Sequence, residues 1–593
     1  MTAYSPPYRD MLFVINELFG LEKINHLEPY QEVTSDILSA VLEEAGRFSR
    51  EVLSPINQKG DQEGAVIRDG KVTTAMGFRE AYRSFVEAGW NGLTGPTGYG
   101  GQGLPLLLGA AVEEMWHSSN MAFTLCPLLT RGAIEAIHYA GSQALKEKYL
   151  PAMVSGRWAG TMNLTEPQAG SDLSSVKTKA VPDGVGYRIF GQKIFITYGD
   201  HDFTENIIHL VLARLPDAPP GVKGLSLFVV PKVLVDTGGQ LGKTNDIRTV
   251  SLEHKLGIHG SPTCVLAYGD GEGAYGEILG EPNRGLELMF VMMNAARFSV
   301  GVQGLALAEK AYQEASGYAH NRIQGIPVGM TSPVPIVHHP DVRRMLASMK
   351  SRVEACRVLA YYGGLMLDLA HAEENVAKRQ RAQERSDLLT PIVKGFCTEM
   401  GVNVASEALQ VFGGMGYIEE TGAAQTMRDA RITTIYEGTT GIQANDLLGR
   451  KLIRDQGAGV MALLEEIKSS LAIHANTDAL KPLADTLSDV VKGVESATWH
   501  LMRESTTRPA TAFGAAVPYL HLMGWLVTAW LMLESAGLAD ANKGAGEAGE
   551  IFYRTKWATV NYFFRHELPK YKVFQEQVCN GGETLMALDP QWL

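Results

Sequence analysis

The stretch Leu164-Thr-Glu-Pro-Gln-Ala-Gly-Ser-Asp-Leu173 marks the point at which the chain changes from helical to strand-like patterning. It follows the predicted strand Gly160–Leu164 and concentrates hydroxyls, carboxylates and turn-forming residues. Backbone N–H groups in such a turn, together with the hydroxyls of Thr165 and Ser171, can bind a pyrophosphate or the edge of a flavin without a lysine. A turn capped by its own Ser and Asp side chains explains the pattern equally well.

Short runs rich in β-branched and aromatic residues surround this stretch, and Gly, Pro and Asp separate them. We expect strands at Gly160–Leu164, Tyr187–Phe190, Lys193–Thr197, Ile207–Leu215, Gly224–Val230 and Pro262–Ala267. Together they predict a β domain that forms a small barrel or sandwich.

On both sides of this domain, apolar residues recur at three- and four-residue spacing, which predicts helices. Leu286–His320, Asp341–Leu369 and Leu388–Phe412 are long enough for an antiparallel bundle, and a loop is expected at 536–549. No G-x-G-x-x-G within a βαβ pattern is present, which argues against a Rossmann site. The predicted fold class is α+β multidomain: an N-terminal extension and α-helical domain (1–157), a central β-barrel domain (158–282), a four-helix-bundle domain (283–455) and an additional C-terminal helical domain (456–593).

The composition of the 593-residue chain narrows the range of partners. A net charge of −12 argues against nucleic acid or an anionic membrane as the main partner, because both require a basic face. The five scattered cysteines form no C-x-x-C pair, which predicts reduced thiols, no zinc site and a cytoplasmic location. The first ten residues do not resemble a signal peptide. The apolar run Tyr519–Leu533 is interpreted as a buried helix, with a membrane-surface role as the alternative.

A second chemical signal lies in Arg431-Ile-Thr-Thr-Ile-Tyr-Glu-Gly-Thr-Thr-Gly-Ile-Gln443. Its one acid, Glu437, precedes residues with helical spacing and is therefore expected at a helix entrance. A carboxylate there is stabilised by the helix dipole and by free backbone N–H groups. Taken alone, this pattern is also that of a routine helix start.

Three stretches together resemble the signature motifs of the acyl-CoA dehydrogenases. They are Thr165-Glu-Pro-Gln-Ala-Gly-Ser-Asp172, Gln410-Val-Phe-Gly-Gly-Met-Gly-Tyr417 and Ile435-Tyr-Glu-Gly-Thr439, in the order and domain context of that family. The similarity covers roughly residues 35–455. The N-terminal lead-in and the extra C-terminal helices are similar to the long bacterial branch that includes 3-methylmercaptopropionyl-CoA dehydrogenases.

The resemblance implies a bound FAD. The matching cofactor-contact positions are Met162, Leu164, Thr165, Ser171, Phe195, Thr197, Arg322, Gln410, Gly414 and Thr439. Phe195 stands where the family usually has Trp, and Tyr198-Gly-Asp-His-Asp202 replaces a shorter Asn-containing turn. Arg322, Gln410 and Gly414 would contact the FAD of a neighbouring subunit. A solvated arginine and a glycine helix cap are the alternatives for Arg322 and Gly414.

The resemblance also implies a catalytic base and an acyl-CoA site. Glu437 matches the base, and Arg297, Ser171, Tyr436 and Gly438 match substrate-binding positions. An intrahelical ion pair is the alternative for Arg297. Burial beside Ile435 and Tyr436 would raise the pKa of Glu437 and strengthen it as a base.

The implied reaction is α,β-dehydrogenation of an acyl-CoA to a trans-2-enoyl-CoA, as in fatty acid β-oxidation. Glu437 would remove the α-proton while the β-hydride passes to flavin N5, and an electron-transferring flavoprotein would accept the electrons. The substrate is expected to be 3-(methylthio)propanoyl-CoA or a short- to long-chain fatty acyl-CoA, and the protein a homodimer with no metal and no transmembrane segment. Alternatives are an acyl-CoA oxidase, a non-catalytic nucleic-acid-binding flavoprotein and a helical scaffold without cofactor.

Overall fold

The computed structural model describes residues 4–544 and 547–593, and the chain forms two compact units. We call Met1–Gly46, Leu106–Ser118 and Val300–Leu593 the helical unit, and Arg47–Pro105 with Ser119–Ser299 the β unit. Residues 1–3 and 545–546, which belong to the predicted N-terminal extension and the predicted loop at 536–549, lie outside the described range. Helices, then strands, then helices follow one another along the chain, which confirms the predicted order of structure types.

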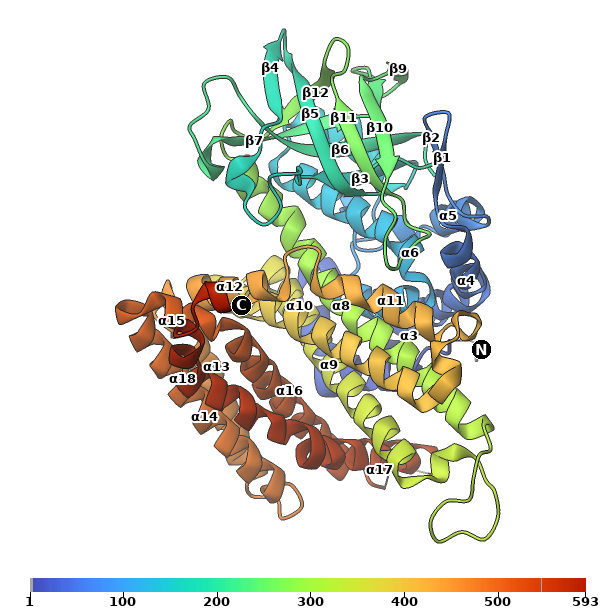
Figure 1. Cartoon of the computed structure of the whole chain (residues 1–593), viewed down its shortest axis with the longest axis vertical. Helices are drawn as coiled ribbons and strands as arrows, with labels where there is room; N and C mark the ends of the chain where they lie inside the picture. The colour runs from blue at the N-terminus through green and yellow to red at the C-terminus, as the bar shows by residue number, and fades with distance from the viewer. Residues whose placement is uncertain (1–3, 545–546) are drawn as a thin grey trace. The chain divides into compact units, whose positions relative to one another are not determined.

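An eight-stranded sheet forms the centre of the β unit (Figure 1), with strand order β10-β11-β5-β12-β7-β6-β3 and β4 paired to β5 and β6. Its strands are β3 (Trp158–Asn163), β4 (Lys179–Asp183), β5 (Gly186–Thr197), β6 (Asn206–Arg214), β7 (Leu225–Pro231), β10 (Ile247–Leu252), β11 (Thr263–Tyr268) and β12 (Ala274–Leu279). Two short hairpins pair β1 (Val66–Arg68) with β2 (Lys71–Thr73) and β8 (Val233–Val235) with β9 (Leu241–Thr244). Closure of the sheet into a barrel stays a prediction.

Strand β5 corrects one sequence prediction, because it joins the two runs expected at Tyr187–Phe190 and Lys193–Thr197. Its pairing changes at Gly191: residues 187–189 pair with β12, and 191–197 with β11. Gly191 has φ 153°, and a Cβ there would lie 2.5 Å from Thr178 Oγ1. The glycine therefore marks a change of partner inside one strand and not a turn.

Two apolar clusters cover the two faces of the sheet. Ile208, Leu210 and Leu212 of β6 belong to one cluster, while Val211 and Ala213 belong to the other. The first cluster also receives residues of α6 (Leu106–Ala140), α7 (Gln143–Val154) and α8 (Gly285–Asn321). A strand buried on both faces reads as a continuous apolar run, as β6 does. The β unit also contains α4 (Ser54–Glu63) and α5 (Phe78–Glu87).

In the helical unit, three long helices correspond to the predicted bundle segments: α8, α9 (Pro340–Ala372) and α10 (Val376–Phe412). Helices α8 and α10 approach closely through glycines, since a Cβ at Gly304 would lie 2.4 Å from the Cys397 carbonyl oxygen. The four-helix arrangement stays a prediction. The other helices are α1 (Tyr8–Leu12), α2 (Glu22–Asn25), α3 (Ser35–Phe48), α11 (Ala423–Arg431), α12 (Thr440–Leu448), α13 (Ala458–His474), α14 (Lys481–Thr507), α15 (Pro509–Gly514), α16 (Ala516–Ala541), α17 (Glu547–Tyr562) and α18 (Tyr571–Met586).

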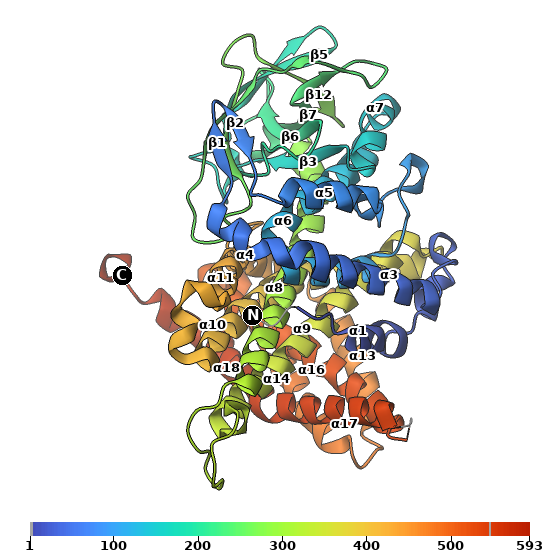
Figure 2. The ribbon, with the colours of Figure 1, turned by 90° about the vertical axis from the view of Figure 1, so that its right-hand side faces the viewer.

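Helix α16 is the centre of the C-terminal region and packs against α9, α10 and α17 (Figure 2). The Phe396 ring of α10 lies over Gly524, where a Cβ would be 2.2 Å away, and stands edge-on to Trp525 at 5.2 Å. By length and apolar composition α8 and α16 are each able to span a membrane, but 83% of the apolar window of α16 is buried in the structure. This burial agrees with its interpretation as a core helix.

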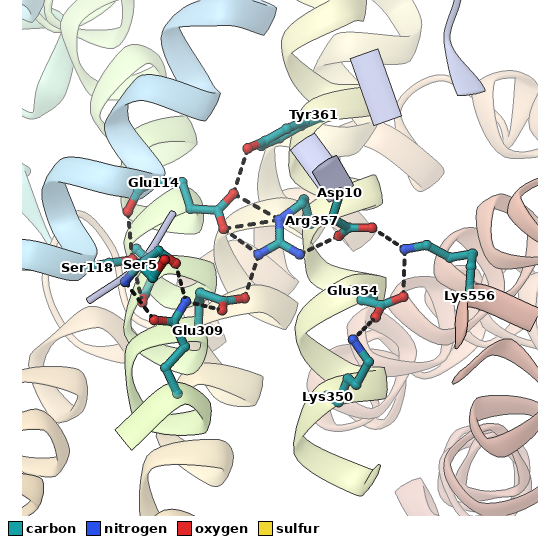
Figure 3. A network of polar contacts seen from close by, with 12 residues as sticks. Ser5, Asp10, Glu114, Ser118, Glu309, Lys350, Glu354, Arg357, Tyr361 and Lys556 are labelled. Atoms are coloured by element: carbon teal, nitrogen blue, oxygen red, sulfur yellow. Dashed lines mark hydrogen bonds and ion pairs between the residues drawn. The ribbon is translucent and has the colours of Figure 1, made fainter. Parts of the chain in front are cut away.

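A buried ionic cluster also lies in the helical unit (Figure 3). Arg357 donates to Asp10 Oδ2, Glu114 Oε1 and Glu309 Oε2, each at 2.6 Å. Lys556 of α17 pairs with Asp10 and with Glu354, at 2.6 Å from Glu354 Oε2. We call these residues the Arg357 cluster. It joins α1, α6, α8, α9 and α17, so the first and last parts of the chain meet there.

Candidate functional site

A buried ion pair fixes the loop at residues 164–178. Glu166 is 3% exposed and Lys193 is fully buried, with Nζ 2.9 Å from Glu166 Oε1. The same carboxylate accepts from the backbone N–H groups of Lys177 (2.7 Å) and Thr178 (3.0 Å) and from Thr178 Oγ1 (2.6 Å). Lys193 Nζ also donates to the carbonyl of Leu164 at 2.9 Å. One carboxylate thus fixes both ends of the loop.

Electrostatics agree with a charged pair. Burial acts to raise the pKa of Glu166, but the Lys193 ammonium and the hydrogen bonds from Thr178 and Lys177 outweigh it and lower the pKa to about 2. Burial lowers the pKa of Lys193 to about 8, against the opposing charge of Glu166. Both groups are therefore ionised at neutral pH.

The same contacts bring two sets of predicted flavin residues together. The N–H of Ile194 donates to the Thr165 carbonyl at 2.9 Å. Thr161, next to Met162, donates from Oγ1 to the Thr197 carbonyl at 2.8 Å. The Leu164 side chain lies in the apolar core, and Met162 packs against it. The end of β3, the loop at 164–178 and the end of β5 therefore form one surface.

The outer side of this surface is open. Ser171 is exposed, a Cβ at Gly170 would meet no atom within 4 Å, and Phe195 is 59% exposed with φ 59°. A large ring rarely adopts a left-handed conformation. The rigid loop at 164–178, the exposed Ser171 hydroxyl and the exposed Phe195 ring fit a planar group with polar edges, such as a flavin.

Glu437 lies in a tight turn of the helical unit. The helix α12 begins at Thr440 with Thr439 as its N-cap, so Glu437 stands two residues before the cap and not in the first helical turn. Glu437 has φ 55° and Gly438 has φ 87°, and both residues are half-buried. A non-glycine residue held in this conformation is typical of functional sites.

The other predicted residues divide between the two units. Arg297 belongs to the β unit, where it is 4% exposed and donates to Asn294 Oδ1 at 3.4 Å. Arg322, Gln410 and Gly414 are exposed in the helical unit. Tyr318, one turn before Arg322, stacks on Phe412, two residues after Gln410, with ring centroids 4.5 Å apart. Arg322 and Gln410 therefore lie at the same end of α8 and α10.

The sequence assigned no functional role to four residues of these sites. It indicated Glu166 only as a turn acid and assigned nothing to Lys193, Gln303 or Gln443, although Gln443 lies in the same stretch as Glu437. Gln303 and Gln443 are both fully buried and bond to the turn that carries Glu437. A polar residue at an otherwise apolar helical position, such as Gln303 between Val302 and Leu305, is the signal that was available.

Comparison with known proteins identifies the family of the whole chain. The N-terminal, middle and C-terminal domains of acyl-CoA dehydrogenase match residues 35–157, 161–270 and 283–452, and an acetyl-CoA dehydrogenase C-terminal-like domain matches 463–589. The chain belongs to the acyl-CoA dehydrogenase family. It is accordingly an FAD-dependent oxidoreductase, and the open surface around Ser171 and Phe195 agrees with that cofactor.

Individual relatives of this acyl-CoA dehydrogenase span nearly its whole length. The 3-methylmercaptopropionyl-CoA dehydrogenase of Ruegeria pomeroyi is 47% identical over 98% of this chain and 99% of its own. A butyryl-CoA dehydrogenase of Syntrophomonas wolfei is 35% identical over 95% and 94%. The structure of an acyl-CoA dehydrogenase from Bacillus anthracis complexed with FAD has a TM-score of 0.75, with 20% identity, covering 98% of this chain and 93% of that one. The similarity thus includes the C-terminal helices.

Proposed function

We propose that this dehydrogenase removes the α-proton of an acyl-CoA with Glu437 and so forms a trans-2-enoyl-CoA. The observation that carries the proposal is the left-handed turn at Glu437, which presents a carboxylate just before α12 within the Ile435-Tyr-Glu-Gly-Thr439 motif. Backbone strain of this kind persists only where the surroundings hold it, and it is concentrated at catalytic positions.

The chain's own residues bind the substrate, exclude water and move the proton. Proton removal from a thioester is aided when N–H donors face the oxygen on which negative charge develops, and the backbone N–H of Glu437 is the proposed donor. FAD, when bound, would supply the acceptor for the β-hydride. We assign its isoalloxazine edge to the surface formed by Thr165, Ser171, Phe195 and Thr197, and substrate contacts to Arg297, Ser171, Tyr436 and Gly438. Met162, Leu164 and Thr439 are also assigned to FAD binding.

Replacement of the base tests this assignment. Glu437→Gln keeps the size of the side chain but removes its basicity, so the purified variant should carry FAD and bind acyl-CoA yet fail to bleach the flavin. We expect a loss of at least about 10³-fold in the anaerobic reduction rate, measured by stopped-flow absorbance. Glu420→Gln, an exposed glutamate of the same unit, is the control. A near-normal rate of flavin reduction in Glu437→Gln would show that Glu437 is not the base.

The substrate is proposed to be a short acyl-CoA with a thioether, 3-(methylthio)propanoyl-CoA, ahead of fatty acyl-CoAs of short to long chain. The support is the 47% identity to a relative described by that substrate. A panel of acyl-CoAs scored by anaerobic flavin reduction should show the highest reduction rate over dissociation constant for the thioether. A higher value for a long-chain acyl-CoA would contradict this choice.

We further propose that an electron-transferring flavoprotein accepts the electrons, that the protein is a homodimer and that it is cytoplasmic. We also propose that the chain has four domains, with boundaries after residues 157, 282 and 455. Arg322, Gln410 and Gly414 are then assigned to the FAD of the partner subunit. Hydrogen peroxide formation without an added acceptor would favour an oxidase, and light scattering would measure the assembly.

A further inference from the structure

The turn that carries Glu437 is held by two buried glutamines from different parts of the helical unit. Gln443, in α12, donates from Nε2 to the carbonyls of Glu437 and Gly438, both at 3.2 Å. Gln303, in α8, accepts a hydrogen bond from the Tyr436 hydroxyl. The residues on either side of Glu437 are therefore fixed, one through its side chain and one through its backbone.

The turn is shaped around Gln443. A Cβ at Gly438 would lie 2.7 Å from Gln443 Nε2, so any larger residue would displace the amide. The φ of 87° at Gly438 independently favours glycine. Because the amide bonds two successive carbonyls, it sets the orientation of both peptide planes after Glu437. Those planes decide where the carboxylate of a residue with φ 55° points.

The contact with Gln303 adds a second constraint. Burial, together with the charge of Glu437, raises the pKa of Tyr436 well above its usual value, so the phenol stays a neutral donor. Gln303 is fully buried, and α8 can bring it close to the turn because Gly304 packs directly against the α10 backbone. The contact joins residues 133 positions apart within one unit.

Neither buried glutamine is the side chain that would give the largest free energy of unfolding at its position. Within the described part of the chain, Gln303 Nε2 and Gln443 Oε1 are buried and lack a hydrogen-bond partner. A buried polar atom without a partner costs free energy that an apolar side chain of the same shape would avoid. All the hydrogen bonds that the two side-chain amides make go to the turn at residues 436–438, so any benefit that offsets this cost lies at that turn.

We propose that Gln303 and Gln443 are positioning residues for the base, acting through Tyr436 and through the carbonyls of Glu437 and Gly438. This inference rests on the proposed function of Glu437. A base displaced by about 1 Å can lose on the order of 10²-fold in rate, so the amides should govern proton removal and not substrate affinity.

Flavin-loaded variants provide the test. Gln443→Met removes the donor at similar size, Gln303→Met removes the acceptor, and Tyr436→Phe removes only the hydroxyl. We expect Gln443→Met to reduce the flavin about 10- to 100-fold more slowly and the other two about 10-fold more slowly, with the acyl-CoA dissociation constants of the two glutamine variants near that of the unsubstituted protein. Tyr436→Phe combined with Gln303→Met should be no slower than either alone, because both changes remove one bond.

A control and a reference variant separate the possible failures. Gln425→Met removes another buried glutamine of the same unit, which bonds to Asp429, and should keep the reduction rate. If all three variants bind FAD and reduce it at the unsubstituted rate while Glu437→Gln is inactive, the positioning inference is wrong and the base assignment stands. If Glu437→Gln itself reduces the flavin normally, the proposed function fails first. Should Gln443→Met not fold, Tyr436→Phe still decides whether Gln303 acts through Tyr436, since loss of one hydroxyl leaves the packing intact.

Discussion

Glu166 shows how much one side chain can organise, since its carboxylate receives five hydrogen bonds from residues that close the loop at 164–178. Such a charge is stable in a buried position only because these donors replace water. Loss of the carboxylate would leave Lys193 charged and buried without its partner. The pair therefore belongs to the framework of the surface that we propose for the flavin.

The depressed pKa of Glu166 gives a pH-dependent prediction. A carboxyl whose folded pKa is lowered from 4.5 to about 2 contributes stability above pH 4.5 and loses it as pH falls toward 2. Glu166→Gln should therefore be less stable than the unsubstituted protein at neutral pH, and the difference should shrink through that window. Urea unfolding at a series of pH values measures it. Glu272→Gln, an exposed glutamate of the same unit, should show no such pH-dependent difference.

At single residues, the roles that the sequence proposed for Ser171, Phe195 and Glu437 came from motif resemblance and stay predictions. The sequence did not indicate that Phe195 and Glu437 adopt positive φ. It also left Glu166 without a role, because its partner Lys193 lies 27 residues away and pairing depends on how β3 and β5 meet. Long-range pairing of this kind depends on tertiary structure, which local patterns do not encode.

Among the helices, the contact between α10 and α16 depends on a missing side chain. Phe396 occupies the space over Gly524, where a Cβ would be 2.2 Å from the ring. Gly395 offers the reciprocal space to Leu520, where a Cβ would lie 2.7 Å from a Leu520 methyl carbon. Small residues at facing positions thus let two helix backbones approach closely.

Filling that space should destabilise the protein. Gly524→Ala gains up to about 1 kcal/mol of helix propensity, but displacing Phe396 costs about 1–3 kcal/mol, so a net loss is expected. Gly581→Ala, in α18, is the matched control because its Cβ would lie 3.8 Å from Gln577 and clash with nothing. The control should be neutral or more stable in thermal unfolding. Equal stabilisation of both variants would contradict the packing argument.

Elements were predictable where they were long or strongly apolar. Periodicity located α8, α9 and α10 to within a few residues at most ends, although α10 begins at Val376, well before the predicted Leu388. That first segment is mostly polar and exposed, so it carries no apolar stripe. The short, exposed strand β9 was missed for the same reason. The first part of the loop expected at 536–549 is helical instead, because α16 continues to Ala541.

For the molecule as a whole, the Arg357 cluster connects parts of the chain that are farthest apart in sequence. Burial opposes ionisation of Asp10, but Lys556 and Arg357 hold the pKa of that carboxyl well below its usual range. No sequence pattern predicted this cluster, since Asp10, Glu309 and Lys556 occur in separate helices with nothing local to relate them. The ion pair between Asp10 and Lys556 depends on how the helices pack and not on any local sequence pattern.

Removing one cation of the Arg357 cluster should lower the free energy of unfolding of the helical unit. Lys556→Met leaves Asp10 and Glu354 each with one cation fewer in a buried site, which should cost about 3 kcal/mol or more. Lys492→Met, which removes an exposed pair with Asp489, should cost at most about 1 kcal/mol. Urea unfolding followed by tryptophan fluorescence compares the two. Equal effects would show that the Arg357 cluster does not stabilise the fold.

The position of Lys556 has a consequence for how the chain is made. Asp10 is among the first residues synthesised, yet one of its two partners emerges only after more than nine-tenths of the protein has been translated. The helical unit, which is assembled from three separate segments, therefore cannot complete its charge balance on the ribosome until its last helices appear. The β unit lies within residues 47–299 and can fold long before that moment. Synthesis that stops short of α17 would release a chain with a folded β unit and an incompletely neutralised interior in the helical unit, a species that folding quality control can recognise.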